Sequence, residues 1–246
     1  MTRAVIMLAL LASSTSVLIL IQSDGPAPMP VYAVVVSDAS ASKASRCVDM
    51  MGNAERAFLD VRRDQRSSMS ILLTGDSTTA LEPVQLTLPP IPFATGKVLE
   101  GRAAESRRRN GFLDEVRRLC EAAEAVQVSS IYMAIRRGAE QLRRRATAQE
   151  GTAMLLASTD LNETASRAIA VALREPAGTP LRHLPAHIDN TGVDVLICGY
   201  AATNGRPGAS RTPDRADRLI EVWSALFTDP DAVRFDPFCA QPTIVG

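Results

Sequence analysis

The sequence predicts an α/β fold, a doubly wound and mostly parallel sheet with helices on both faces in a three-layer sandwich. Residues 31–37 read Val-Tyr-Ala-Val-Val-Val-Ser, a continuous apolar run typical of a central strand that is buried on both faces. Similar apolar runs occupy 153–158 and 193–198. Amphipathic helical patterns separate these runs, and strands that alternate with helices are typical of a wound parallel sheet.

The other elements follow in chain order. Helical spacing of apolar residues extends from Lys43 to about Arg63. Residues 84–88 alternate between apolar and polar, so we expect a strand there that pairs antiparallel at the sheet edge. Pro213 after Thr212 is a start signal for the last amphipathic helix. The remaining predicted elements are a strand at 68–74 and helices at 101–126, 131–145 and 163–174.

Residues 1–23 are expected to form an apolar helix outside the domain. No charge occurs from Ala4 to Ile21, and this length is close to the roughly 20 residues that span a bilayer. Arg3 before the run and Asp24 after it favour a cytoplasmic N-terminus and an exported body. We favour an uncleaved signal anchor, with a cleaved signal peptide as the alternative. The body is then either anchored to the membrane outside the cytoplasm or exported.

The domain boundaries follow from this segment. A linker rich in Pro and Gly covers 24–30, and the α/β domain covers 31–230. The C-terminal tail, 231–246, either packs back on the domain or extends from it.

Composition narrows the possible partners. The chain has 246 residues, with 27 Lys and Arg balanced by 27 Asp and Glu, so it offers no electrostatic case for nucleic acid. Arginines cluster between 107 and 145, but glutamates lie near them, which predicts solvated helix faces with local ion pairs. The alternative is a basic patch that faces anionic lipid or an acidic partner.

The four cysteines leave the redox state open. An even number in an exported chain permits two disulfides in three possible pairings. Cys198 ends an apolar run and is expected to be a buried small hydrophobe. The other three, which are likelier partners in a bridge, are Cys47, Cys120 and Cys239.

Three oxygen-bearing side chains follow the first predicted strand at alternate positions. Asp38, Ser40 and Ser42 would stand where the chain leaves the carboxyl end of that strand, which is where open α/β sheets bind ligands. One carboxylate and two hydroxyls suit a hard cation that keeps part of its water shell, as Mg²⁺ does. The simpler alternative is a helix N-cap.

Two later segments strengthen the case for a metal site. Asp38-Ala-Ser40-Ala-Ser42 resembles the opening Asp-x-Ser-x-Ser of the metal-ion-dependent adhesion site (MIDAS) in the von Willebrand factor A (vWA) family. Residues 129–135, Ser-Ser-Ile-Tyr-Met-Ala-Ile, are similar to the family's Thr-Asp-Ile-x-x-Ala-Leu, with Ser129 in place of Thr. The strand at 153–158 leads to Asp160, similar to the family's third metal loop.

The resemblance implies a bacterial, membrane-anchored or exported vWA domain that binds Mg²⁺ or Mn²⁺. The hydroxyls of Ser40, Ser42 and Ser129 would hold the cation directly or through water, and Asp38 and Asp160 would hold its waters. One position would stay open for an acidic residue of a partner protein. The implied function is protein binding and not catalysis.

The alternative function is a haloacid-dehalogenase-like phosphatase with Asp38 as nucleophile. That chemistry needs a second Asp two positions later as general acid, and this chain has Ser40 there. A serine hydrolase is disfavoured as well, because the sequence has no Gly-x-Ser-x-Gly elbow. The only imidazoles, His183 and His187, are expected to lie in a loop or at a strand edge.

Overall fold

The structure is a computed structural model. The structure describes ten segments, on which all structural statements below rest. These segments are residues 31–37, 51–52, 54–55, 68–74, 84–87, 98–122, 130–148, 151–163, 165–200 and 213–237.

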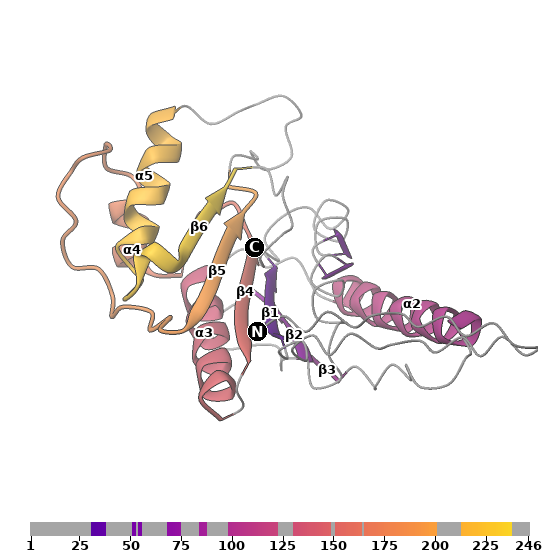
Figure 1. Ribbon diagram of the computed structural model, residues 1–246. Coiled ribbons are helices and arrows are strands. Elements are labelled where there is room, and N and C mark those ends of the chain that lie inside the picture. Colours follow the sequence, from indigo (N-terminus) through magenta and orange to yellow (C-terminus); the bar gives the residue numbers. More distant parts are fainter. Residues whose placement is uncertain are drawn as a thin grey trace, which may run out of the picture.

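Six strands form one sheet in the order β3-β2-β1-β4-β5-β6 (Figure 1). Every neighbouring pair is parallel except β2 and β3, which are antiparallel at the edge. This is the order of a doubly wound sheet. The vWA/Rossmann-like architecture predicted from the sequence is therefore confirmed. The strands are β1 (Val31–Ser37), β2 (Ser68–Leu73), β3 (Val84–Thr87), β4 (Thr152–Ser158), β5 (Val193–Cys198) and β6 (Val233–Asp236).

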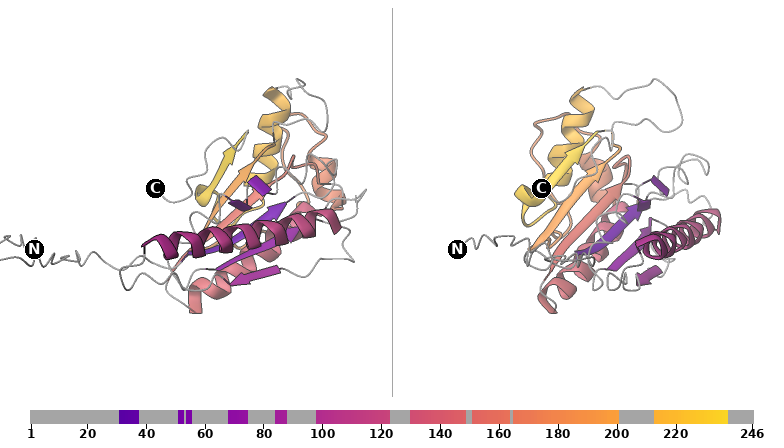
Figure 2. Two further views of the ribbon diagram at one scale, coloured as in Figure 1. Left: turned by 90° about the vertical axis from the view of Figure 1, so that its right-hand side faces the viewer. Right: turned by 45° about the vertical axis from the view of Figure 1, so that its right-hand side comes forward.

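Helices cover both faces of the sheet. The helices α3 (Ile131–Ala148), α4 (Arg167–Ala172) and α5 (Pro213–Ser224) share one apolar core with one face. The long helix α2 (Val98–Ala122) packs on the other face (Figure 2). The three layers therefore comprise α3, α4 and α5, then the sheet, then α2.

The alternation of side chains along β1 explains its continuous apolar sequence. Tyr32, Val34 and Val36 face the core with α3 and α5, whereas Val31, Ala33 and Val35 face the core with α2. All six are buried, because the strand lies in the middle of the sheet with helices on both sides.

Helix α3 lies very close to the sheet at Gly138. A Cβ at this position would lie 2.9 Å from Leu155 Cδ1 and 3.0 Å from Val34 Cγ1. The missing side chain therefore lets α3 pack directly over β1 and β4. Because α3 leads into β4 and runs antiparallel to it, the helix begins at the carboxyl edge of the sheet.

The predicted ion pairs on the arginine-rich helices are present. Arg109 also reaches Glu55, which lies far away in the sequence. The pairs within helices are Arg117–Asp114, Arg118–Glu115 and Arg136–Glu140. These arginines are therefore neutralised locally, as expected for solvated helix faces.

The structure departs from two sequence-based expectations and decides a third point that the sequence leaves open. The helix expected over 163–174 is confined to 167–172, and Glu163 lies in the preceding loop. The C-terminal segment packs back on the domain where Val233–Asp236 form β6 beside β5. The expectation that Cys198 is a simple buried hydrophobe is wrong, because Cys198 forms a disulfide.

Cys120 forms a disulfide as well, and no described cysteine is free. A free cysteine and a disulfide-bonded cysteine can both be buried at the end of an apolar strand. The sequence pattern around Cys198 therefore cannot distinguish the two states. Cys47 and Cys239 lie outside the described residues, and so does the predicted N-terminal helix, 1–23. Among the helices that the structure describes, none is long and apolar enough to cross a membrane.

Candidate metal-binding edge of the sheet

The carboxyl ends of β1 and β4 lie side by side at the point where the winding of the sheet reverses. From β1 the chain goes to β2 on one side, while β4 is the neighbour on the other side. Ser37, the last residue of β1, is in register with Ser158, the last residue of β4. Such a switch point is the usual ligand-binding position of a doubly wound sheet.

The N-terminus of α3 belongs to the same edge. Ser130 is buried, and its carbonyl accepts a hydrogen bond from the Ala134 N–H at 3.1 Å, so it directly precedes the helix. The backbone N–H of Tyr132 donates to Glu163 Oε2 at 2.7 Å. This bond ties the first turn of α3 to the loop that follows β4.

The other oxygen of Glu163 caps the start of α4. Glu163 Oε1 accepts from the backbone N–H groups of Ala165 at 2.7 Å and Ser166 at 3.0 Å. Glu163 is only 3% exposed. A buried carboxylate is stable where several N–H groups compensate for its lost hydration, and helix starts supply such groups. One side chain therefore connects the two helix starts.

Asp160 has a defined orientation within this loop. Its side chain is turned toward Asn162, whose backbone N–H donates to Oδ1 at 2.9 Å and whose Nδ2 donates to Oδ2 at 2.8 Å. The residue is 8% exposed. The backbone contact forms an Asx turn, and the contact between the two side chains further fixes the orientation of the carboxylate.

Leu161 shapes the same turn through an uncommon backbone conformation. Its φ is 60°, in the left-handed region that residues other than glycine rarely adopt. The Leu161 N–H donates to Thr159 Oγ1 at 3.0 Å, and the Leu161 carbonyl accepts from Trp223 Nε1 at 3.1 Å. Contacts from two directions hold the strained residue in place, a pattern found at functional loops.

The structure describes one of the five predicted metal ligands. Asp160 lies at the carboxyl edge of β4, as predicted. The other four, Asp38, Ser40, Ser42 and Ser129, lie outside the described residues. Their described neighbours Ser37 and Ser130 both belong to this edge. Within the described segments, no group of three or more His, Cys, Asp or Glu side chains could hold a metal.

The available donor chemistry fits a hard cation. Asp160 contributes a carboxylate at the switch point, and carboxylate and hydroxyl oxygens are the ligands that Mg²⁺ and Mn²⁺ accept. The predicted partners of Asp160 in the site are one further carboxylate and three hydroxyls, all oxygen donors. No nitrogen or sulfur ligand belongs to the predicted set.

Sequence analysis missed three residues that organise this edge. Glu163 was assigned to a helix, and its bonds to two helix starts involve long-range contacts that no local pattern reveals. Asn162 orients Asp160, and Arg215 on α5 donates to Asn162 Oδ1 at 3.2 Å. Arg215 also donates to the carbonyl of Leu173, so α5 supports the loop from behind. An Asn two residues after an Asp is a turn signal that could have pointed to the Asx turn.

Comparisons with known proteins give structural likenesses only. No protein-family model matches the chain, and no curated protein matches it. The pilus adhesin SpaC from Lactobacillus rhamnosus GG aligns with a TM-score of 0.47 and 12% identity, over 88% of this chain and 28% of the adhesin. The chain therefore spans little more than a quarter of the adhesin's length.

Two shorter proteins align over most of their own length. Manganese-loaded Plasmodium vivax TRAP protein has a TM-score of 0.38 and 16% identity, with 79% of this chain and 72% of TRAP covered. The VWA domain of SpRpn10 has a TM-score of 0.35 and 9% identity, with 87% of this chain and 92% of that domain covered. Because these identities and TM-scores are low, the likenesses carry no functional argument, and the proposed function depends on this chain's own residues.

Proposed function

We propose that this protein is a metal-ion-dependent protein-binding module. Asp38, Ser40, Ser42, Ser129 and Asp160 hold Mg²⁺ or Mn²⁺ at the switch point. An acidic residue of a partner protein completes the coordination. The observation that carries the proposal is the convergence of three chain segments, because Ser37, Ser130 and Asp160 all belong to one edge of the sheet.

The proposed ligands define what the site does. When bound, the cation supplies an electrophilic centre that accepts a carboxylate oxygen. Hydroxyl ligands carry no charge, so they leave more of the positive charge for the partner than carboxylates would. The Asx turn holds the Asp160 carboxylate at the edge, and Glu163 holds the start of α3 beside it. This arrangement selects a carboxylate in one geometry, which suits adhesion or assembly and not catalysis.

The proposal places the domain outside the cytoplasm. Disulfides persist in oxidising compartments and are rare in the cytosol, and both described cysteines are disulfide-bonded. The apolar segment 1–23 would then act as a membrane anchor or an export signal. The two features are independent of each other, and both favour export.

Metal titration of the full chain tests this function. Isothermal calorimetry with MgCl₂ and MnCl₂ should give saturable binding that Asp38→Ala abolishes and that Asp160→Asn weakens at least about tenfold. Asn at 160 keeps an oxygen for the turn but removes the charge. The matched control is Asp231→Ala, an exposed carboxylate just before β6 and therefore at the opposite edge of the parallel sheet.

The controls make the outcomes distinct. Circular dichroism should show that each variant retains the wild-type fold, and Asp231→Ala should bind metal like the wild type. Wild-type protein that binds neither cation, or an Asp38→Ala variant with unchanged affinity, would overturn the proposal.

A further inference from the structure

A cavity of about 640 Å³ lies between α4 and the loop that connects α4 to β5. Its volume is within the range of pockets that hold small ligands or peptide side chains. None of the predicted metal ligands lines it. The lining residues that matter below are Arg167, Val171, Glu175, Thr179, Arg182 and His183.

The lining of this cavity carries an excess of positive charge. Arg167 and Arg182 are exposed and form no ion pair with any residue that the structure describes, unlike Arg117, Arg118 and Arg136 on α2 and α3. His183 stands beside Arg182 with a φ of 59°. Glu175 is the single acidic lining residue, and its Oε2 already accepts a hydrogen bond from Arg218 Nη2 at 3.0 Å. The arginine charges are therefore available to an anion.

Part of the cavity lining is apolar. Val171 is 48% exposed and is one of two large hydrophobic residues that are exposed in the described part of the chain. Ala168 and Pro180 also line the cavity. A lining that combines exposed apolar surface with two arginines fits a ligand that carries both an anionic group and an apolar group.

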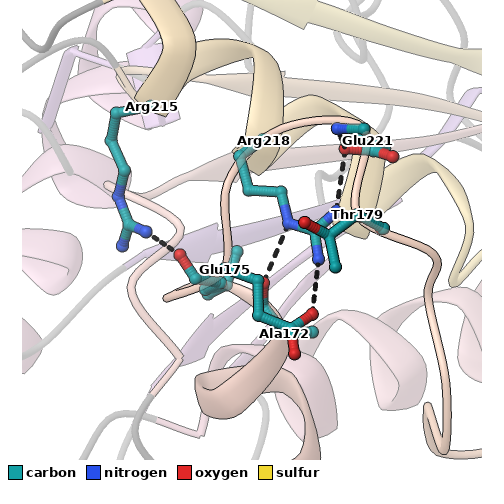
Figure 3. Close-up of polar contacts among 8 residues, drawn as sticks. Ala172, Glu175, Thr179, Arg215, Arg218 and Glu221 are labelled. Atoms are coloured by element: carbon teal, nitrogen blue, oxygen red, sulfur yellow. Dashed lines mark hydrogen bonds and ion pairs between the residues drawn. The ribbon is translucent and has the colours of Figure 1, made fainter.

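A buried arginine holds the cavity walls in place. Arg218 on α5 is 1% exposed, and its guanidinium donates to the carbonyls of Ala172 at 2.9 Å and Thr179 at 2.8 Å (Figure 3). Both acceptors line the cavity, as does Glu175. Three lining residues are thus bonded to one buried side chain, so a ligand would meet a preformed site.

Glu221 completes this support. Its Oε2 accepts from Arg218 Nη1 at 2.9 Å and from the Gly178 N–H at 3.1 Å. These two hydrogen bonds, that from Arg218 first, lower the pKa of Glu221 below its ordinary value of 4.5. The carboxylate therefore stays charged at neutral pH and keeps the loop around Gly178 attached to α5.

We propose that this cavity binds an acidic peptide segment of a partner protein, with a carboxylate between Arg167 and Arg182 and an apolar side chain on Val171. The apolar part of the lining favours a peptide over inorganic phosphate, which has no apolar group to place there. This site does not depend on the metal site, so each can fail without the other.

Fluorescence anisotropy with the full chain in mild detergent tests the proposal. The probe is a fluorescein-labelled peptide of alternating leucine and glutamate, and EDTA is present to remove any bound metal ion. The peptide should bind, and its leucine–glutamine counterpart should bind about tenfold more weakly or not at all. Binding should also weaken as salt is raised, because the arginines are exposed.

Charge-reversal variants locate the binding site. Arg167→Glu combined with Arg182→Glu should weaken peptide binding at least about tenfold, and Val171→Asp should weaken it too. The matched control is Arg174→Glu, an exposed arginine after α4 that does not line the cavity. This control should leave binding unchanged. Peptide binding that survives the double reversal would overturn the proposal, as would binding of inorganic phosphate in place of the peptide.

Discussion

Glu163 connects two helix starts that are far apart in the sequence. Its carboxylate accepts three backbone N–H groups, one from Tyr132 in α3 and two just before α4. A glutamate before an apolar periodic segment is typical of a helix's first turn, which is why the sequence predicted a helix from 163. The bond to Tyr132 joins residues 31 positions apart and leaves no local signal.

The Glu163→Gln variant should be measurably less stable. A carboxamide has one acceptor oxygen, so its NH₂ group would face a backbone donor at one of the two helix starts. A buried donor left without an acceptor costs about 1–3 kcal/mol. Urea unfolding followed by circular dichroism should show this loss. The control Glu121→Gln, on the exposed surface of α2, should change the free energy of unfolding by less than about 0.5 kcal/mol. Equal midpoints for the two variants would contradict the role of Glu163.

At the scale of elements, the glycines of α3 and α2 differ in how closely their surroundings pack against them. Gly138 in α3 lies against the side chains of Leu155 and Val34, whereas a Cβ at Gly111 in α2 would meet nothing within 4 Å. Alanine normally stabilises a helix interior relative to glycine by about 0.5–1 kcal/mol. Substitution at Gly111 therefore reports helix propensity alone, whereas substitution at Gly138 also reports packing against the sheet.

The same substitution should thus have opposite signs in the two helices. Gly111→Ala should raise the free energy of unfolding by about 0.5–1 kcal/mol through propensity alone. Gly138→Ala should lower it by about 1–3 kcal/mol, because the methyl group must displace α3 from β1 and β4. Chemical denaturation of both variants checks the prediction. Stabilisation by Gly138→Ala would show that α3 can move away from the sheet at little cost.

Element prediction from the sequence succeeded where a pattern is local and strong. Buried strands such as β1 are continuous apolar runs, and Pro213 marks the first residue of α5, as predicted. The short strand β6 has only four residues, Val-Arg-Phe-Asp, of which Val233 alone is buried, and so short an alternation of apolar and polar residues does not predict a strand. Pairing with β5 stabilises it, and pairing is a long-range property.

At the scale of the whole molecule, the sequence predicts the candidate site only in parts. Asp38, Ser40 and Ser42 stand at alternate positions of one short segment, so their pattern can be recognised before any fold is known. That Asp160 and the start of α3 lie at the same edge depends on the strand order, which local patterns do not specify. The cationic cavity was not foreseen, because its residues come from a helix and a loop without a motif.

The disulfide bonds of Cys120 and Cys198 should stabilise the whole domain, and they indicate that it folds in an oxidising compartment. Cys120 in α2 and Cys198 in β5 are both fully buried in the core on the α2 face, and both are bridged. A native disulfide typically stabilises a protein by about 2–5 kcal/mol, largely by restricting the unfolded chain in the chain-entropy model. Reduction should therefore lower stability even where the native contacts survive.

Urea unfolding with and without tris(2-carboxyethyl)phosphine should show a clear decrease in the midpoint on reduction. Thiol titration of the denatured, unreduced protein should find Cys120 and Cys198 unreactive. The control is the Cys120→Ala, Cys198→Ala double variant, which lacks both of the described disulfide-bonded cysteines. Reductant should shift the urea midpoint of this variant much less than that of the wild type. Wild-type protein whose midpoint ignores reductant, and whose two thiols react after denaturation, would contradict the prediction. It would also remove the structural argument for an oxidising compartment, and export would then depend on the N-terminal segment alone.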